Sequence, residues 1–299
     1  MNAPRRTLSA CGRTIELGER PWLMGVVNAS PDSFSDGGLH ADLEARVTLA
    51  RGLLDGGADI IDIGGESATT GIPPLPVEEE LGLVVPLVEA VVGELGVLVS
   101  VDTYKPQVAE AAIAAGAGIV NDVSGLRDPR LAEVCASTGA ALVLMHTRAA
   151  PRERLQDPGL YDDVTGEVLD FLQERIAAAL RAGCRLEQLV VDPGPDFAKT
   201  PAQTVELLRE LPRLHELERP LLLAISRKDF IGALSGRSPR ERLAGTLAAL
   251  DHGIRCGAHI FRLHDIREAA DFVRVRAALA GELHVDTQLS LQEELRHER

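Results

Sequence analysis

LMGVVNASPDSFSDGG, residues 23–38, joins a short apolar run to a polar loop that ends in paired glycines. An apolar run this short, bounded by turn residues, is typical of a buried strand. Asn28 and the polar residues behind it follow directly at the carboxyl end of that strand. In α/β sheets and barrels, the chemistry lies at this end of the strands. The rest of the chain repeats the arrangement.

The repeat is visible as five Gly-Ala or Gly-Cys steps, with glycines at positions 57, 116, 139, 183 and 257, each followed by an apolar run. Glycine at a helix carboxyl terminus adopts the left-handed cap conformation, so each step predicts a helix stop and a strand start. The predicted strands are residues 23–27, 60–63, 97–101, 119–120, 142–145, 189–191, 221–225 and 260–261. The predicted helices are residues 42–54, 77–93, 106–115, 129–137, 161–182, 202–211, 239–253 and 266–280.

About eight strands alternating with helices in 299 residues predict an α/β fold, a single (β/α)8 TIM barrel. Residues 8–17 predict an N-terminal hairpin that would plug the bottom of the barrel. Residues 1–281 are assigned to the barrel domain, and residues 282–299 to a charged tail that is frayed or disordered. The Pro- and Arg-rich residues 149–159 are expected to form a flexible loop at the barrel mouth.

Composition excludes several classes of partner. A net charge of −14 argues against nucleic acid and membrane surfaces, so any bound phosphate needs a local positive pocket. The four cysteines are far apart, which favours reduced thiols of a cytoplasmic protein over disulfides or zinc. No apolar segment follows the first arginines, which argues against a signal peptide. The longest hydrophobic stretch, residues 81–101, is interrupted by Pro86, Glu89 and Glu94, which predicts a helix followed by a strand rather than a membrane span.

Polar residues end the predicted strands, and a barrel collects them at one face. They are Asn28, Asp62, Glu66, Asp102, Asn121, Asp122, His146, Asp192, Ser226, Arg227, Lys228, Arg262 and His264. A strand-end Asp is often only a helix cap, and for Asp62 and Asp122 a cap and a site residue are equally good interpretations. A site is the better interpretation for four of the residues taken together: Asp102, Asn121, Asp192 and Lys228. Burying that many polar groups at one end costs free energy unless they are paired or bind a ligand.

The types of these side chains indicate the ligand. Carboxylates, an amide and an ammonium around one pocket suit a flat heterocycle with alternating donors and acceptors, such as a pterin. The last strand lies beside the first in a closed barrel, so Asn28, Arg262 and His264 would cradle a diphosphate. A divalent ion would bridge the diphosphate oxygens to Asn28. Arg227 and Lys228 add positive charge, although a plain surface role is also open for them.

From about residue 23 to residue 280, the chain resembles the dihydropteroate synthases of folate biosynthesis. The motifs that carry the resemblance are NASPDSFSDGG at residues 28–38, DIGGES at 62–67, SVDT at 100–103, NDVSG at 121–125, DPG at 192–194, SRK at 226–228 and RLH at 262–264. The resemblance implies an alkyl-transferring enzyme that condenses 6-hydroxymethyl-7,8-dihydropterin diphosphate with p-aminobenzoate, giving dihydropteroate and pyrophosphate. It also implies Mg²⁺ as the cofactor and a cytoplasmic homodimer.

The resemblance further implies roles for single residues. Those that would bind the pterin are Asp102, Asn121, Asp192 and Lys228, and those that would bind pyrophosphate and magnesium are Asn28, Arg262 and His264. Ser226, expected at a helix start, would hold the carboxylate of p-aminobenzoate, with Arg227 beside it. Phe34 and Asp36 would close over the reacting centre and exclude water. The residues assigned to catalysis are Asp102, Asp192, Lys228 and Arg262.

The chain departs from the family pattern in two places. After Ser67 the family usually continues Thr-Arg-Pro-Gly, whereas this chain has Ala68-Thr69-Thr70-Gly71, in which Thr69 or Thr70 would restore one donor. After residue 194 the family prefers an apolar residue, Gly and Phe, whereas Asp196 here places a carboxylate near an anionic acceptor, which it would repel.

Such changes resemble those in divergent actinobacterial second copies of the enzyme. Three functions therefore stay open for the chain. The first is a working synthase, and the second is a diverged pterin-binding paralogue with another acceptor or no catalysis. The third is a pterin-dependent methyltransferase, which would need a corrinoid partner domain that this chain has no segment to form.

Overall fold

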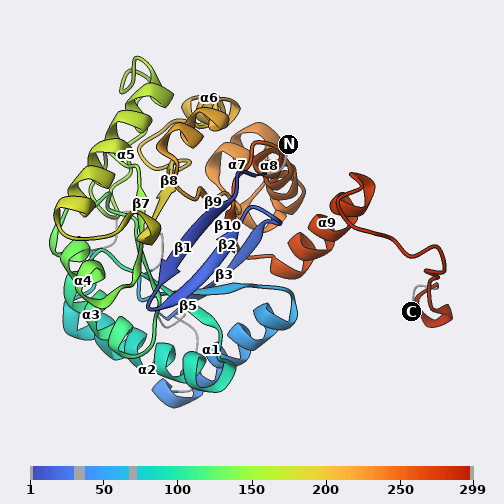
Figure 1. The fold of residues 1–299 in the computed structure, drawn as a ribbon, viewed down its shortest axis with the longest axis horizontal. Coiled ribbons are helices and arrows are strands. Elements are labelled where there is room, and N and C mark those ends of the chain that lie inside the picture. The colour runs from blue at the N-terminus through green and yellow to red at the C-terminus, as the bar shows by residue number, and fades with distance from the viewer. Residues whose placement is uncertain (1–2, 30–37, 67–72, 297–299) are drawn as a thin grey trace.

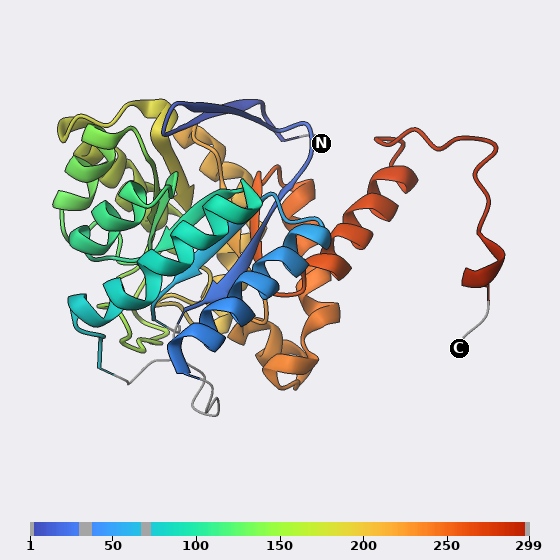
Figure 2. The ribbon, with the colours of Figure 1, turned by 90° about the horizontal axis from the view of Figure 1, so that it is seen from below.

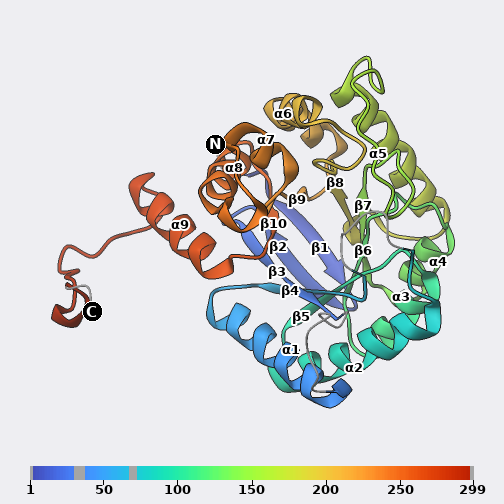
Figure 3. The same cartoon turned by 180° about the vertical axis from the view of Figure 1, so that it is seen from behind.

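The computed structural model describes residues 3–29, 38–66 and 73–296 of the chain. Eight parallel strands form one sheet in the order β8-β7-β6-β5-β4-β3-β10-β9, and a bridge between Val191 and Leu221 brings its two edges together. The strands are β3 (Trp22–Asn28), β4 (Ile60–Gly64), β5 (Leu98–Asp102), β6 (Ile119–Asp122), β7 (Ala141–Met145), β8 (Leu189–Asp192), β9 (Leu222–Ala224) and β10 (Ile260–Leu263). The predicted TIM barrel is confirmed (Figures 1 and 3).

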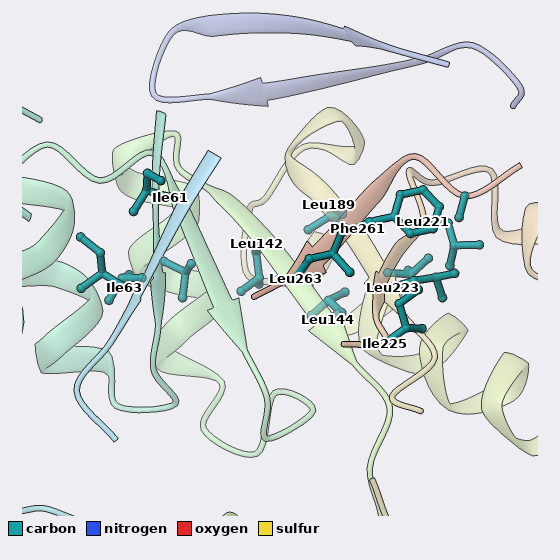
Figure 4. Packing of buried hydrophobic residues seen from close by; sticks show 14 of the residues in the cluster. Ile61, Ile63, Leu142, Leu144, Leu189, Leu221, Leu223, Ile225, Phe261 and Leu263 are labelled. Atoms are coloured by element: carbon teal, nitrogen blue, oxygen red, sulfur yellow. The ribbon is translucent and has the colours of Figure 1, made fainter. Parts of the chain in front are cut away.

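Helices surround the sheet (Figure 1). They are α1 (Gly38–Asp55), α2 (Val77–Leu95), α3 (Pro106–Ala114), α4 (Arg130–Thr138), α5 (Val164–Arg181), α6 (Pro201–Arg209), α7 (Asp229–Ser235), α8 (Leu243–Arg255) and α9 (Ile266–Leu279). The glycines of all five predicted helix stops have positive φ, between 77° and 110°, so the stops are confirmed. Apolar residues on the outer face of the strands, such as Ile61, Leu142 and Leu223, form the core between barrel and helices (Figure 4).

Three helix predictions need correction. The predicted helix 161–182 begins later, at Val164, because the Asp163 carboxylate caps it by accepting a hydrogen bond from the Gly166 N–H. Residues 239–241 form a separate 3-10 turn, and α8 begins at Leu243. Helix α7 was not predicted, because its seven residues are too few to show a helical periodicity.

The amino end of the barrel is sealed by the predicted hairpin, β1 (Arg6–Ala10) and β2 (Arg13–Leu17), which lies across it (Figure 2). Leu8, Ala10, Ile15 and Leu17 of the hairpin are buried in one cluster with inward-facing side chains of the strands. The plug is therefore confirmed, and the carboxyl ends of the strands form the open end of the barrel.

At its other terminus the chain leaves the barrel. Helix α9 points away from the body, and residues 281–296 lie beyond it, exposed, with one short 3-10 turn (Figure 1). No described helix combines the length and the apolarity that crossing a membrane requires. All four cysteines are unpaired, as predicted.

Candidate functional site

The alternation of the strands sends one set of polar side chains into the barrel lumen. The bottom layer of the lumen, packed against the hairpin, includes Ile60, Leu98, Ile119 and Ile260. Two residues further along the same strands are Asp62, Ser100, Asn121 and Arg262. The lumen therefore changes from apolar to polar between one layer and the next, on the side of the open end.

Arg262 is the centre of this polar layer. Its Nε donates to Asp62 Oδ2 at 2.6 Å, and its Nη2 donates to Asp102 Oδ2 at 2.7 Å. Asn121 Nδ2 lies 3.3 Å from the same Asp62 oxygen, as its donor. Asp62 is fully buried and its other oxygen, Oδ1, has no hydrogen-bond partner. Asp62 is thus a residue of the polar lumen and not a helix cap.

Two carboxylates of the lumen have strongly perturbed acidity. Burial raises the pKa of Asp102 to about 7, although the Arg262 guanidinium opposes the rise. Burial raises the pKa of Asp192 to about 6, opposed by the hydrogen bond that its Oδ1 accepts from the Gly194 N–H at 2.8 Å. Both groups therefore exchange a proton near neutral pH, which is common at functional sites.

Lys228 lies at the mouth, half-buried, as the N-cap residue of α7. Its Nζ is 4.2 Å from the centre of the Phe197 ring, a cation–π contact. Burial lowers its pKa, and the carboxylates of Asp196 and Asp192 oppose that change. Lys228 and Asp192 thus interact through their charges at the same end of the barrel, where the sequence predicted both to face one pocket.

Two predicted acceptor-binding residues are held by the protein itself. Ser226 Oγ lies 2.9 Å from His264 Nδ1 and accepts the His264 N–H at 3.2 Å. The prediction that Ser226 stands at a helix start was wrong, because α7 begins only at Asp229. Arg227 donates from Nη2 and Nε to the Asp265 carboxylate at 2.5 and 3.1 Å, so its charge is already paired.

Other strand-end residues point away from the lumen. Asp122 accepts the N–H groups of Ser124 and Leu126 in the turn after β6. It is therefore not a helix cap, because α4 begins only at Arg130, with Pro129 as its N-cap residue. Glu66 forms a cluster of ion pairs with Lys105 at 2.6 Å and with Arg152 at 3.1 Å. Arg152 belongs to the predicted mouth loop, residues 149–159, which the structure shows without helix or strand.

The Asp196 carboxylate also has partners in the protein. Its Oδ1 accepts from Thr204 Oγ1 at 3.1 Å, and its Oδ2 accepts the Phe230 N–H, in the first turn of α7, at 3.3 Å. The negative charge therefore lies at the positive end of a helix. The backbone here is left-handed, with φ of 66° at Asp196 and 50° at Ala198.

Lys199 is a buried residue at this end of the barrel that the sequence reasoning missed. It lies in the loop after β8, is fully buried, and its Nζ is 2.8 Å from His146 Nδ1. The sequence does distinguish Lys199, because only three of the 31 basic residues are lysines and the others are arginines. All three, Lys105, Lys199 and Lys228, follow barrel strands.

Asn28, the predicted metal ligand, ends β3 with its side chain exposed. Among the described residues, no three His, Cys, Asp or Glu side chains are grouped as metal ligands. One amide oxygen fits a Mg²⁺ ion that arrives on a diphosphate, because Mg²⁺ usually keeps few protein ligands and binds substrate phosphates. Phe34, Asp36 and Thr69 of the predicted site lie outside the described residues.

The barrel with its polar lumen belongs to a known class. Residues 24–264 match the family described as pterin binding enzyme. The dihydropteroate synthase of Escherichia coli K12 is 40% identical over 291 residues, which cover 97% of this chain and 99% of that protein. The chain belongs to the dihydropteroate synthase family.

Solved structures agree. The dihydropteroate synthase of Xanthomonas albilineans with 4-aminobenzoic acid matches with a TM-score of 0.84 at 44% identity, covering 93% of this chain and 99% of that one. The same enzyme in complex with 7,8-dihydropteroate matches with a TM-score of 0.81 at 44% identity and the same coverage.

Proposed function

We propose that the protein is a working dihydropteroate synthase, which joins 6-hydroxymethyl-7,8-dihydropterin diphosphate to p-aminobenzoate and releases pyrophosphate. One observation carries the proposal: Arg262 holds Asp62 and Asp102 in the lumen, beside Asn121, at fixed distances of 2.6 to 3.3 Å. Such a pre-positioned set of acceptors and donors matches the edge of a pterin ring. The curated relatives and the solved structures support the same reaction.

The charge of the lumen explains how the reaction is helped. When ionised, Asp62 and Asp102 bring two negative charges to the lumen, of which Arg262 compensates one. Asp192 brings a third negative charge, which Lys199 and Lys228 face. When the carbon–oxygen bond to the diphosphate breaks, the diphosphate takes the electron pair and the pterin methylene becomes a delocalised cation. Fixed negative charge in a site shielded from water stabilises that cation. The amine of p-aminobenzoate then forms the new carbon–nitrogen bond and loses a proton.

We propose Mg²⁺ as the cofactor, with Asn28 as its protein ligand and Arg262 and His264 towards the diphosphate. Bound magnesium would neutralise charge on the departing diphosphate. We expect calorimetry to show that Mg²⁺ strengthens binding of the pterin diphosphate and leaves binding of the pterin alcohol unchanged. Equal magnesium dependence for the two ligands would place the metal away from the diphosphate.

A second candidate function, a paralogue with another acceptor, rests on Ala68-Thr69-Thr70 and on Asp196. The structure weakens the argument from Asp196, because its carboxylate is hydrogen-bonded to Thr204 and to the first turn of α7. The decisive assay uses purified protein, pterin diphosphate, Mg²⁺ and p-aminobenzoate, and measures pyrophosphate and dihydropteroate together. Binding of the pterin without formation of dihydropteroate would support the paralogue instead.

We further propose a cytoplasmic homodimer. The unpaired cysteines suit a reducing compartment. Large apolar side chains are exposed on α7 (Leu234) and on α9 (Val275 and Leu279), and a second copy would remove such side chains from water. Light scattering on the purified protein tests the dimer, and a monomer at micromolar concentration would contradict it.

A further inference from the structure

Lys199 is a buried ammonium whose partners all belong to the walls of the pterin site. Its Nζ donates to Gly194 O and to Phe197 O, both at 3.0 Å, and to His146 Nδ1 at 2.8 Å. An ammonium has three donors, so this set uses all of them. Within the described part of the chain, no carboxylate lies within ion-pair distance of it.

The two carbonyls come from residues that also contact the site. The N–H of Gly194 donates to the Asp192 carboxylate at 2.8 Å, and the Phe197 ring lies 4.2 Å from Lys228 Nζ. Lys199 thus holds, by hydrogen bonds to its carbonyls, the segment whose Gly194 N–H orients Asp192 and whose Phe197 ring contacts Lys228. His146 connects Lys199 to the end of β7, because its ring contacts the Lys199 ammonium and its backbone N–H donates to Asp192 O at 2.9 Å.

The backbone conformation of this segment is strained, so other groups must hold it in place. Gly194, Asp196 and Ala198 are all left-handed, with φ of 64°, 66° and 50°. Left-handed residues other than glycine are strained and persist only where the surroundings hold them. The segment also presses on β7, since a Cβ at Gly194 would lie 2.1 Å from His146 O. The curled backbone turns two carbonyls towards one point, and the Lys199 ammonium occupies that point.

We propose that Lys199 is a positioning residue of the pterin half of the site: its ammonium fixes the loop of residues 192–198 and places a buried positive charge behind Asp192. An apolar side chain of the same length would fill the space without the cost of burying an unpaired ammonium. What the ammonium adds is the orientation of two carbonyls and a favourable field at an acceptor of the pterin. The inference rests on the proposed function, in that Asp192 holds the pterin.

Charges around the pair set the expected pH behaviour. Asp192 is faced by three cations from three elements: Lys199, Lys228 and Arg262. Burial lowers the pKa of Lys199 to about 7; Asp192 and Asp196 oppose this change, and Lys228 and Arg148 add to it. Lys199 therefore carries its charge in the acidic range in which Asp192 takes up its proton. Removing the Lys199 charge disfavours the ionised form of Asp192 and raises its pKa further. The pH below which pterin affinity declines should therefore move upwards in a variant without the charge.

The test compares Lys199→Met with Lys105→Met in the 299-residue chain, at pH values below 7 where Lys199 is charged. Lys105 serves as the control, because it is a partly buried lysine at the same end of the barrel but forms ion pairs with Glu66 and Glu80 instead. We expect Lys199→Met to raise the Kd for pterin diphosphate at least tenfold and to shift its pH dependence upwards. The KM for p-aminobenzoate should stay within twofold, and Lys105→Met should bind the pterin like the wild type. A pterin Kd unchanged in Lys199→Met, or raised equally in both variants, would refute the proposal.

A measurement on the wild type keeps the test valid if Lys199→Met does not fold. With 15N-lysine labelling at a pH below 7, where Lys199 is charged, the chain reports three side-chain nitrogens, since it has three lysines. We expect the Lys199 resonance to move when the pterin diphosphate saturates the site, and an unmoved Lys199 beside a shifted Lys228 would refute the role. If the wild type itself fails to bind the pterin, the proposed function fails; if all three proteins bind it equally, only the role of Lys199 fails.

Discussion

Asp192→Asn separates the charge of the carboxylate from its shape. Asp192 is 2% exposed as a residue, and its Oδ1 accepts the Gly194 N–H at 2.8 Å. An amide in its place keeps its oxygen on that N–H and turns its NH2 group to the lumen, where an acceptor oxygen had been. Losing a charge-assisted hydrogen bond costs about 1.5 to 3 kcal/mol, which corresponds to a roughly 10- to 150-fold higher Kd for the pterin diphosphate.

The effect on stability should have the opposite sign. Burial raises the pKa of Asp192 to about 6 in the folded protein, against about 3.9 in an unfolded chain. The folded state therefore holds the proton more tightly than the unfolded chain does. Ionisation of Asp192 lowers the free energy of unfolding increasingly from about pH 4 to about pH 6, and this loss keeps its full size above pH 6. Asparagine cannot ionise, so the ligand-free variant should melt at the same or a higher temperature than the wild type at pH 8.

Calorimetry with the pterin diphosphate at pH 8 and thermal melts at pH 5 and pH 8 test both parts. The difference in melting temperature between Asp192→Asn and the wild type should shrink at pH 5, where the wild-type carboxyl is largely protonated. An unchanged pterin affinity would remove Asp192 from the site. A variant that is clearly less stable at pH 8 would show that the ionised carboxylate is needed for the fold, and the reasoning from burial would be wrong.

Three further changes are informative. Arg262→Met leaves the carboxylates of Asp62 and Asp102 without their cation, which should lower the free energy of unfolding in urea by about 3 to 5 kcal/mol at pH 8. Because burial raises the pKa of Asp102 to about 7, this loss should be smaller at pH 5. Equal losses at the two pH values would contradict its origin in the ion pairs. Ala198→Gly relieves a φ of 50° and should stabilise the protein by about 1 kcal/mol, and a lower urea midpoint would show that the strain is absent. Asp196→Gly should lower the KM for p-aminobenzoate, by up to about threefold since the charge is already held by α7. A higher KM would mean that Asp196 helps to bind the acceptor.

The barrel was predictable because its signals are local. Each Gly-Ala or Gly-Cys step needs only one residue with positive φ to mark a helix stop, and the structure has positive φ at all five. The hairpin was predictable from alternation, and its role as a plug followed from its place before the first barrel strand. Helix α7 escaped because seven residues carry no periodicity, although the Gly236 that ends it is the same kind of stop, with φ of 68°.

The site was predictable only as a collection of residues. The strand-end pattern placed Asp102, Asn121 and Arg262 in one lumen, but sequence could not show which of them pair. Pairing depends on distances between strands, such as the 2.6 and 2.7 Å contacts of Arg262 with residues 200 and 160 positions away. The partners of Asp196 could not be predicted either, because its carboxylate accepts the Phe230 N–H of α7, a helix that the sequence did not predict.

Pairing changes the interpretation of charge at the mouth of the barrel. Sequence suggested a positive pocket made by Arg227, Lys228 and Arg262 in a chain of net charge −14. In the structure, Arg227 is paired with Asp265, and Arg262 with two carboxylates. Lys228, with a cation–π contact and no ion pair within the described residues, is then the cation most available to a ligand. Carboxylates deep in the lumen and a cation at its rim suit a reaction in which the pterin methylene becomes a cation while the diphosphate departs, because fixed charge of the opposite sign then lies near each charge that develops.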